Sequence, residues 1–277
     1  MPVLAQEATA EGRIFNEIAG ILIRQRTEHI EPQLRELREQ LLAVYNGPRR
    51  ADVNFATCQI GLALSAFGLG DHDEAMRQAS NALKNGAGQL TVMINAQMMY
   101  ANMGEFALAR KTAAASREAF AGDFEALQIS GAAFVDCLDF DAGIDCLEQM
   151  AKLAPPESLM VQIKGGIAFL SEMSSAARFL KLTADDLMER ASCVVDVIRA
   201  AGHKIYWVEL AGHRPGASTL QFFVDADPDI CADLTFAVAE ALTSRYAETA
   251  VDLVTMAVRT HEGVLVTQAS NVLELVS

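Results

Sequence analysis

Small residues recur in this chain every 34 positions. Ala75, Ala109, Gly143 and Ala177 follow this spacing. Other residues keep the same step, namely Gly70 with Gly104, Tyr100 with Phe134 and Gly131 with Gly165. A period of 34 residues is typical of stacked helical hairpins, in which each repeat packs against its neighbours. The spacing therefore predicts a helical-repeat segment with small residues where two helices approach closely.

The composition is that of a globular protein, and the pattern along the chain divides it into three segments. Of the 277 residues, 51% are hydrophobic and 21% are charged, which is enough apolar material for a sizeable core. We expect a helical pair at 1–50, the repeats at 51–182 and a further domain at 183–277. No apolar stretch reaches the ~18 residues of a membrane span, and Glu7 and Arg13 stand where a secretory signal would be apolar. A cytoplasmic protein without a membrane partner is expected.

Acidic side chains outnumber basic ones, and the excess is largest near the C-terminus. The formal net charge is −14, and residues 183–277 carry 6 basic against 14 acidic side chains. Nucleic-acid binders need clustered Lys and Arg, so we expect no nucleic-acid partner. Such a charge attracts basic proteins, although solubility alone also explains it.

The segment 1–50 is expected to form two helices. Apolar residues recur at helical spacing in the first, at Ile14, Phe15, Ile18, Ile21 and Leu22, and Glu31-Pro32 begins the second. Asn46-Gly47-Pro48 ends it. Both helices have an apolar face, so the pair either caps the repeats or lies within their groove.

From about residue 52 to 182 the chain resembles the tetratricopeptide repeat family. The residues similar to that family's pattern are Gly70-Asp71-His72-Asp73-Glu74-Ala75 with Ala82-Leu83 in the first repeat, Tyr100 and Gly104 to Ala109 in the second repeat, and Gly131, Phe134, Asp139 to Gly143 and Pro155 in the third repeat. A partial fourth unit has Gly165 and Ala177. The pattern is incomplete, because Ala66 replaces an aromatic residue and Leu138 a glycine. A generic bundle of α-hairpins is the alternative.

The resemblance implies a concave groove lined by the first helix of each unit. Its apolar positions, which we call the stripe, are the candidate partner-binding residues Ile60, Leu64, Phe67, Ile94, Met98, Ala101 and Val135. An apolar stripe favours a hydrophobic segment or helix as ligand over a charged C-terminus. Residues 7–45 or the C-terminal domain could instead fill the groove, because large exposed apolar patches are uncommon.

The pattern changes after residue 182. Thr183 can cap a helix that Gly202 closes. The elements expected next are strands at 204–210 and 218–225, a helix at 229–245, and a strand hairpin from 251–259 and 264–267. This α-β-β-α-β-β order predicts a small α+β domain with an antiparallel sheet and two helices on one face. The whole chain is thus expected to be α+β, with all-α repeats first.

Few residues suggest chemistry. Asp225, Asp227 and Asp229 could ligate Mg²⁺ or Ca²⁺, but Asp227-Pro228 at the start of a helix favours capping, so no metal site is expected. The histidines are His29, His72, His203, His213 and His261, and the five cysteines are Cys58, Cys137, Cys146, Cys193 and Cys231. None belongs to a catalytic or metal-binding motif, and no glycine-rich loop that would hold phosphate is present. We expect buried free thiols and no cofactor.

These observations favour a non-catalytic protein that holds a protein partner, either basic or presenting an apolar segment. Acidic three-repeat proteins with apolar grooves resemble bacterial secretion chaperones and adaptors, while acidic binders resemble immunity proteins that neutralise basic toxins. A small enzyme within 183–277 is the alternative from another class, because loop histidines at sheet ends can gather into a site. A homo-oligomer that uses its grooves for self-assembly is the third.

Overall fold

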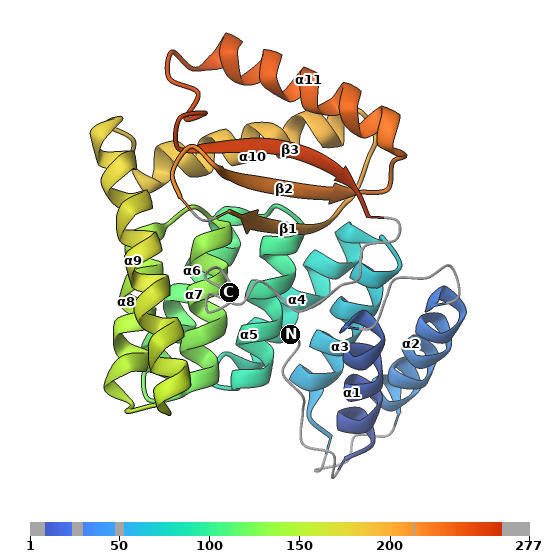
Figure 1. Ribbon diagram of the computed structural model, residues 1–277. Coiled ribbons are helices and arrows are strands. Elements are labelled where there is room, and N and C mark those ends of the chain that lie inside the picture. Colours follow the sequence, from blue (N-terminus) through green and yellow to red (C-terminus); the bar gives the residue numbers. More distant parts are fainter. Residues whose placement is uncertain (1–8, 24–29, 48–52, 213, 262–277) are drawn as a thin grey trace. The chain divides into compact units, whose positions relative to one another are not determined.

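The computed structural model describes residues 9–23, 30–47, 53–212 and 214–261. Its elements in chain order are α1 (Ala10–Ile23), α2 (Ile30–Asn46), α3 (Phe55–Gly68), α4 (His72–Gly86), α5 (Leu90–Asn102), α6 (Phe106–Ala119), α7 (Phe124–Asp136), α8 (Phe140–Lys152), α9 (Glu157–Phe179), α10 (Ala184–Ala200), β1 (Ile205–Ala211), β2 (Ser218–Val224), α11 (Pro228–Arg245) and β3 (Val254–Thr260). The fold is α+β, as expected, with a long helical region followed by a small sheet (Figure 1). No helix among the described residues is both long and apolar enough to cross a membrane.

Contacts divide the chain into two compact units. The described residues of the first unit end at Met99, and the second runs from Tyr100 to His261. The second unit therefore contains α6 to α9 together with the α/β elements. The three segments expected at 1–50, 51–182 and 183–277 follow motifs rather than contacts, and they stay a prediction.

Side-chain caps start most of the helices. The residues whose side chains accept a backbone N–H of the first turn are Thr9, Asn54, Asp71, Asp123, Asp139, Thr183 and Asp227. A cap of this kind satisfies one of the four backbone donors that a helix leaves unpaired at its N-terminus. At Thr183 the cap is reciprocal, because Asp186 also accepts the Thr183 N–H. The helix starts predicted at Thr183 and Asp227 are confirmed.

In the first unit, α1 and α2 pack on α3. A Cβ atom at Gly61 of α3 would lie 2.7 Å from Leu41 of α2, and one at Gly68 would lie 2.7 Å from Leu22 of α1. These two glycines let the N-terminal helices approach the α3 backbone. The two N-terminal helices predicted from the apolar spacing are therefore present, and they cover α3.

The hairpin turns repeat at 34-residue spacing. Gly70, Gly104 and Leu138 each adopt a positive φ, of 73°, 78° and 59°. In each turn this residue donates its N–H to the carbonyl three positions earlier, and the next residue donates to the carbonyl five positions before it, at 2.8–3.0 Å. Leu138 thus keeps the turn although a non-glycine residue is disfavoured there.

Small residues lie at the helix contacts, as the period predicts. Ala75 in α4, Ala109 in α6 and Gly143 in α8 are buried, each on the second helix of its hairpin. A Cβ atom at Gly143 would lie 3.1 Å from Leu170 and 3.2 Å from Val135, so little room is left there. Consecutive packed helix pairs are thus present in the chain.

The partial fourth hairpin is not formed. Gly165 and Ala177 lie in one continuous helix, α9, of 23 residues. One period after Leu138 the chain has Glu172, and Met173 follows where Asp71 and Asp139 cap the earlier helices. Without a turn residue or a cap, nothing ends the helix there.

The sheet is mixed rather than antiparallel. Its strand order is β1-β2-β3, with β1 and β2 antiparallel but β2 and β3 parallel. The chain leaves β2, forms α11 and returns along β2, and a crossover of this kind produces parallel pairing. The strand expected at 264–267 lies outside the described residues.

The buried face of the sheet forms the core of the second unit. Val208, Phe222 and Val258 are paired across the three strands and are buried. The ring of Phe106, the first residue of α6, meets Phe222 edge-on at 6.3 Å. Next to β3, the last strand in the sheet order, α11 packs against both β3 and α10 (Figure 1).

Within the part of the sheet that the structure describes, each outer strand has one backbone N–H bonded to a side chain. The backbone N–H of Val208 in β1 donates to the Asn102 side chain at 3.5 Å. The N–H of Val258 in β3 donates to the Thr235 hydroxyl at 3.0 Å. Two of the polar groups that an edge strand exposes are thereby satisfied within the unit.

Candidate functional site

The stripe predicted to bind a partner is largely buried. Ile60, Leu64, Phe67, Ile94, Ala101 and Val135 are each no more than 7% exposed, and only Met98 is half-buried. They lie on α3, α5 and α7, the first helix of each hairpin, as the pattern predicted. Their role in binding a partner stays a prediction. In the folded chain, however, these side chains are largely shielded from solvent.

The N-terminal helices pack on α3, the helix that carries the first part of the stripe. Phe15 and Leu22 of α1 and Leu34 and Leu41 of α2 lie against α3 and are buried. The contacts of α1 and α2 are thus with α3, and the alternative in which residues 7–45 fill the groove stays a prediction. Ile60 and Leu64 are themselves buried, so an apolar ligand would have to displace the side chains that cover them.

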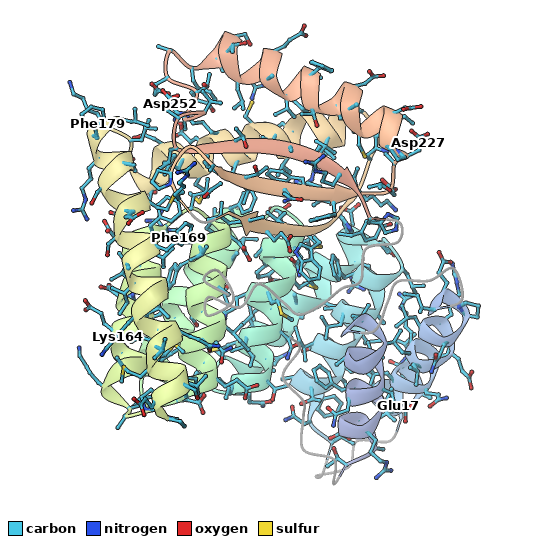
Figure 2. All side chains as sticks on the ribbon, in the orientation of Figure 1. Glu17, Lys164, Phe169, Phe179, Asp227 and Asp252 are labelled. Carbon is cyan, nitrogen blue, oxygen red and sulfur yellow. The ribbon has the colours of Figure 1, made fainter. Side chains whose placement is uncertain are left out.

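The acidic run has two structural roles. Asp227 caps α11 by accepting the Ile230 N–H at 2.9 Å, and Asp229 lies in the first turn of that helix, where a negative charge is favourable. Figure 2 shows Asp227 at the start of α11. Asp225, which we expected to contribute to capping, instead accepts the Lys204 N–H at 2.9 Å. No cluster of three potential metal ligands occurs among the described residues.

Two histidines lie at one end of the sheet. His203 Nδ1 lies 3.3 Å from an Asp225 carboxylate oxygen, and the His261 ring stacks on Tyr206 with centroids 4.9 Å apart. His261 also hydrogen-bonds the Val224 carbonyl at 3.0 Å. His29 and His213 lie outside the described residues. A His–Asp pair can act as a general base, and this pair is the feature that an enzyme in 183–277 would use.

The cysteines are all free and buried, as expected. Burial, reinforced by the nearby Glu11 carboxylate, raises the pKa of the Cys58 thiol to about 12. Burial likewise raises the pKa of the Cys146 thiol to about 12 and that of Cys137 well above its usual value. A thiol must ionise to act as a nucleophile, so these side chains are structural.

The first unit contains a polar pocket of about 730 Å³. Its lining consists of amide, aromatic and small side chains, namely Tyr45, Asn46, Val53, Asn54, Phe55, Ala56, Gln59 and Asn85. Asn85 donates to Gln59 at 2.8 Å, and Gln59 donates to the Tyr45 hydroxyl at 3.3 Å. The described lining residues carry no charge, so the pocket suits an uncharged polar group. Sequence reasoning missed it, because the lining is contributed by the ends of several helices and has no motif.

A buried carboxylate lies behind this pocket. Glu11 is 2% exposed and accepts the Asn54 N–H at 2.9 Å. Asn54 is the N-cap of α3, and Glu11 itself lies in the first turn of α1. The positive ends of two helix dipoles therefore compensate its charge, and the group is explained by structure alone.

Arginines hold the second unit together. Arg110 of α6 pairs with Asp139, at 2.6 Å, and with Asp185 of α10. Arg199 of α10 donates to the Met103 carbonyl at 2.9 Å and to Glu105 at 2.7 Å. These bonds join α10 to the hairpins within the unit.

Comparisons with known proteins assign no family. No protein-family model matches the chain, and no curated protein is significantly similar to it. Function must therefore be argued from the molecule itself.

Proposed function

We propose that this chain is a non-catalytic interaction protein of the cytoplasm that binds a basic partner protein through its acidic surface. Its hairpins are those of a tetratricopeptide-like repeat protein. The observation that carries the proposal is the burial of the stripe, because it leaves the exposed charged surface rather than the stripe available to a partner. An immunity protein that neutralises a basic toxin would work in this way.

The distribution of charge supports this proposal. Residues 183–277 carry 14 acidic side chains against 6 basic ones. Several arginines of the second unit are already engaged, among them Arg190, which donates to the Glu248 carbonyl, and Arg245, which lies 3.7 Å from Asp196. The remaining field is negative, and such a field accelerates association with a basic protein and suppresses acidic competitors.

A chaperone or adaptor that holds an apolar segment in the stripe is the second candidate. The apolar character of Ile60, Leu64 and Ile94 favours it. It requires that the partner displace the side chains that bury these residues in the folded chain. This displacement costs free energy that direct binding to exposed charge does not.

The test is co-purification of the untagged full chain from its native cell, followed by mass spectrometry and repeated at low and high salt. We expect a stoichiometric basic protein that high salt releases, because exposed charges are screened. A stoichiometric partner retained at high salt would favour the apolar stripe. If instead the purified chain converted a small molecule and the His203→Ala variant did not, the enzyme alternative would replace the proposal.

A further inference from the structure

The outer face of α11 exposes an aromatic side chain. Phe236 is 73% exposed, while Cys231, Leu234, Val238 and Leu242 on the opposite face are buried. Its neighbours along the helix surface, at three and four residues in each direction, are Ala232, Asp233, Ala239 and Glu240. All four are exposed. Phe236 therefore has small residues on one flank and carboxylates on the other.

The acidic flank continues toward the start of the helix. Asp229, seven residues before Phe236, is exposed on the same side. None of Asp229, Asp233 and Glu240 makes an ion pair with the described residues. By contrast, Asp139, Asp141 and Asp145 in and around α8 each meet an arginine. The α11 carboxylates are thus among those left for an external cation, and they lie beside an exposed aromatic side chain.

We infer that this α11 face, centred on Phe236 and edged by Asp229, Asp233 and Glu240, is the docking surface for a basic amphipathic helix of a partner protein. The inference rests on the proposed function and locates its interface. Lys or Arg side chains would meet the carboxylate flank. The small flank at Ala232 and Ala239 lets an aliphatic face approach the helix and cover Phe236, an aromatic anchor of the kind that dominates interfaces.

A matched control exists in the same unit. Phe179, at the C-terminal end of α9, is 85% exposed (Figure 2). Its neighbours at three and four residues before are Ala176 and Ser175, and the adjacent Arg178 pairs with Asp141 at 2.8 Å. It is as exposed as Phe236 but lacks the carboxylate flank. Loss of Phe179 therefore reports what an exposed ring contributes without complementary charge.

The experiment measures fluorescence anisotropy of a labelled amphipathic helical peptide of leucine and lysine, with its leucine–glutamate counterpart as the charge control. The full chain is compared with Phe236→Ser, with the double variant Asp233→Asn and Glu240→Gln, and with the controls Phe179→Ser and Glu172→Gln. We expect the wild type to bind only the lysine peptide. Each α11 variant should weaken binding by about tenfold or more, and each control by less than about twofold. Circular dichroism and thermal melts confirm that every variant is folded.

Three outcomes would overturn the inference. The first is that the α9 and α11 variants weaken peptide binding equally, and the second is that the lysine peptide does not bind. The third is that the full chain forms a dimer that Phe236→Ser dissociates, which would make a second copy of the chain the occupant. If the native partner is captured as well by the α11 variants as by the wild type, the proposed function stands and its location on α11 is wrong. If the lysine peptide binds as expected but no native protein partner is found, the surface stands and the proposed function is wrong.

Discussion

At the scale of single residues, the hairpin turns depend on residues whose backbone adopts a positive φ. Gly104 has φ +78°, and a Cβ atom there would lie 2.6 Å from Val195 of α10. The 34-residue spacing predicted glycine at this turn but not its neighbour in α10, which comes from a segment some 90 residues later. One atom at this position would therefore affect both the turn and the packing of α10 on it.

We expect Gly104→Ala to destabilise the second unit. The left-handed conformation alone costs an alanine ~1–2 kcal/mol, and the contact with Val195 adds to it. Gly122→Ala is the control, because a Cβ there meets nothing within 4 Å. Chemical denaturation of both variants measures the difference. Equal free energies of unfolding would show that the turn is not constrained as described.

The pKa of Glu209 gives stability a pH dependence at the residue scale. Burial raises the pKa of this carboxyl above its usual value, against the opposing effect of Trp207. Its ionised form is thus disfavoured in the folded state, and stability is lost as pH rises from the unfolded value of about 4.3 through the raised folded value. Glu209→Gln should therefore be more stable than the wild type at neutral pH.

The same variant should lose this advantage in acid. Below the unfolded pKa both states of the wild type carry a neutral carboxyl, so the glutamine no longer removes a buried charge. Urea titrations of Glu209→Gln, the wild type and the exposed-site control Glu172→Gln at neutral and acidic pH measure this. A stability difference that is the same at both pH values would contradict a titrating Glu209.

At the scale of elements, the small residues set how closely helices pack. We expect Ala109→Leu to destabilise the chain by ~1–3 kcal/mol, because Ala109 is fully buried and added volume forces α6 from its neighbours. Ala114→Leu lies on the exposed side of the same helix and should change stability by less than ~0.5 kcal/mol. Thermal and chemical denaturation compare the two. Similar losses in both variants would mean that α6 does not pack through Ala109.

Helices were predictable from local signals, and strand pairing was not. Thr183, Asp227 and the hairpin turns mark element boundaries that the structure confirms. The fourth hairpin failed because a few small residues at the right period do not break a helix without a turn residue near Glu172. The pairing of β3 with β2 depends on where α11 returns the chain, which residues 251–259 do not encode.

At the scale of the whole molecule, the resemblance to the repeat family implied which residues form the stripe but not what covers it. The apolar faces at Phe15 and Leu34 showed that the N-terminal helices must pack against another part of the protein. The sequence allowed two arrangements, in which the pair either caps the repeats or lies within their groove. The structure shows that both helices pack on α3 through Gly61 and Gly68, where glycine permits an approach that any side chain would block. The α11 face escaped sequence reasoning because exposure depends on which side of the helix meets β3.

The side-chain bonds to the outer strands of the described sheet bear on how this protein can associate. A foreign strand that paired with β1 or β3 would first have to break the bonds from Val208 to Asn102 and from Val258 to Thr235. Open strand edges are the usual template for runaway polymerisation into fibres. With one N–H withdrawn from each outer strand of the described sheet, strand addition there forgoes a backbone hydrogen bond, and misassembly between copies of the chain through these strands is disfavoured by the same two side chains.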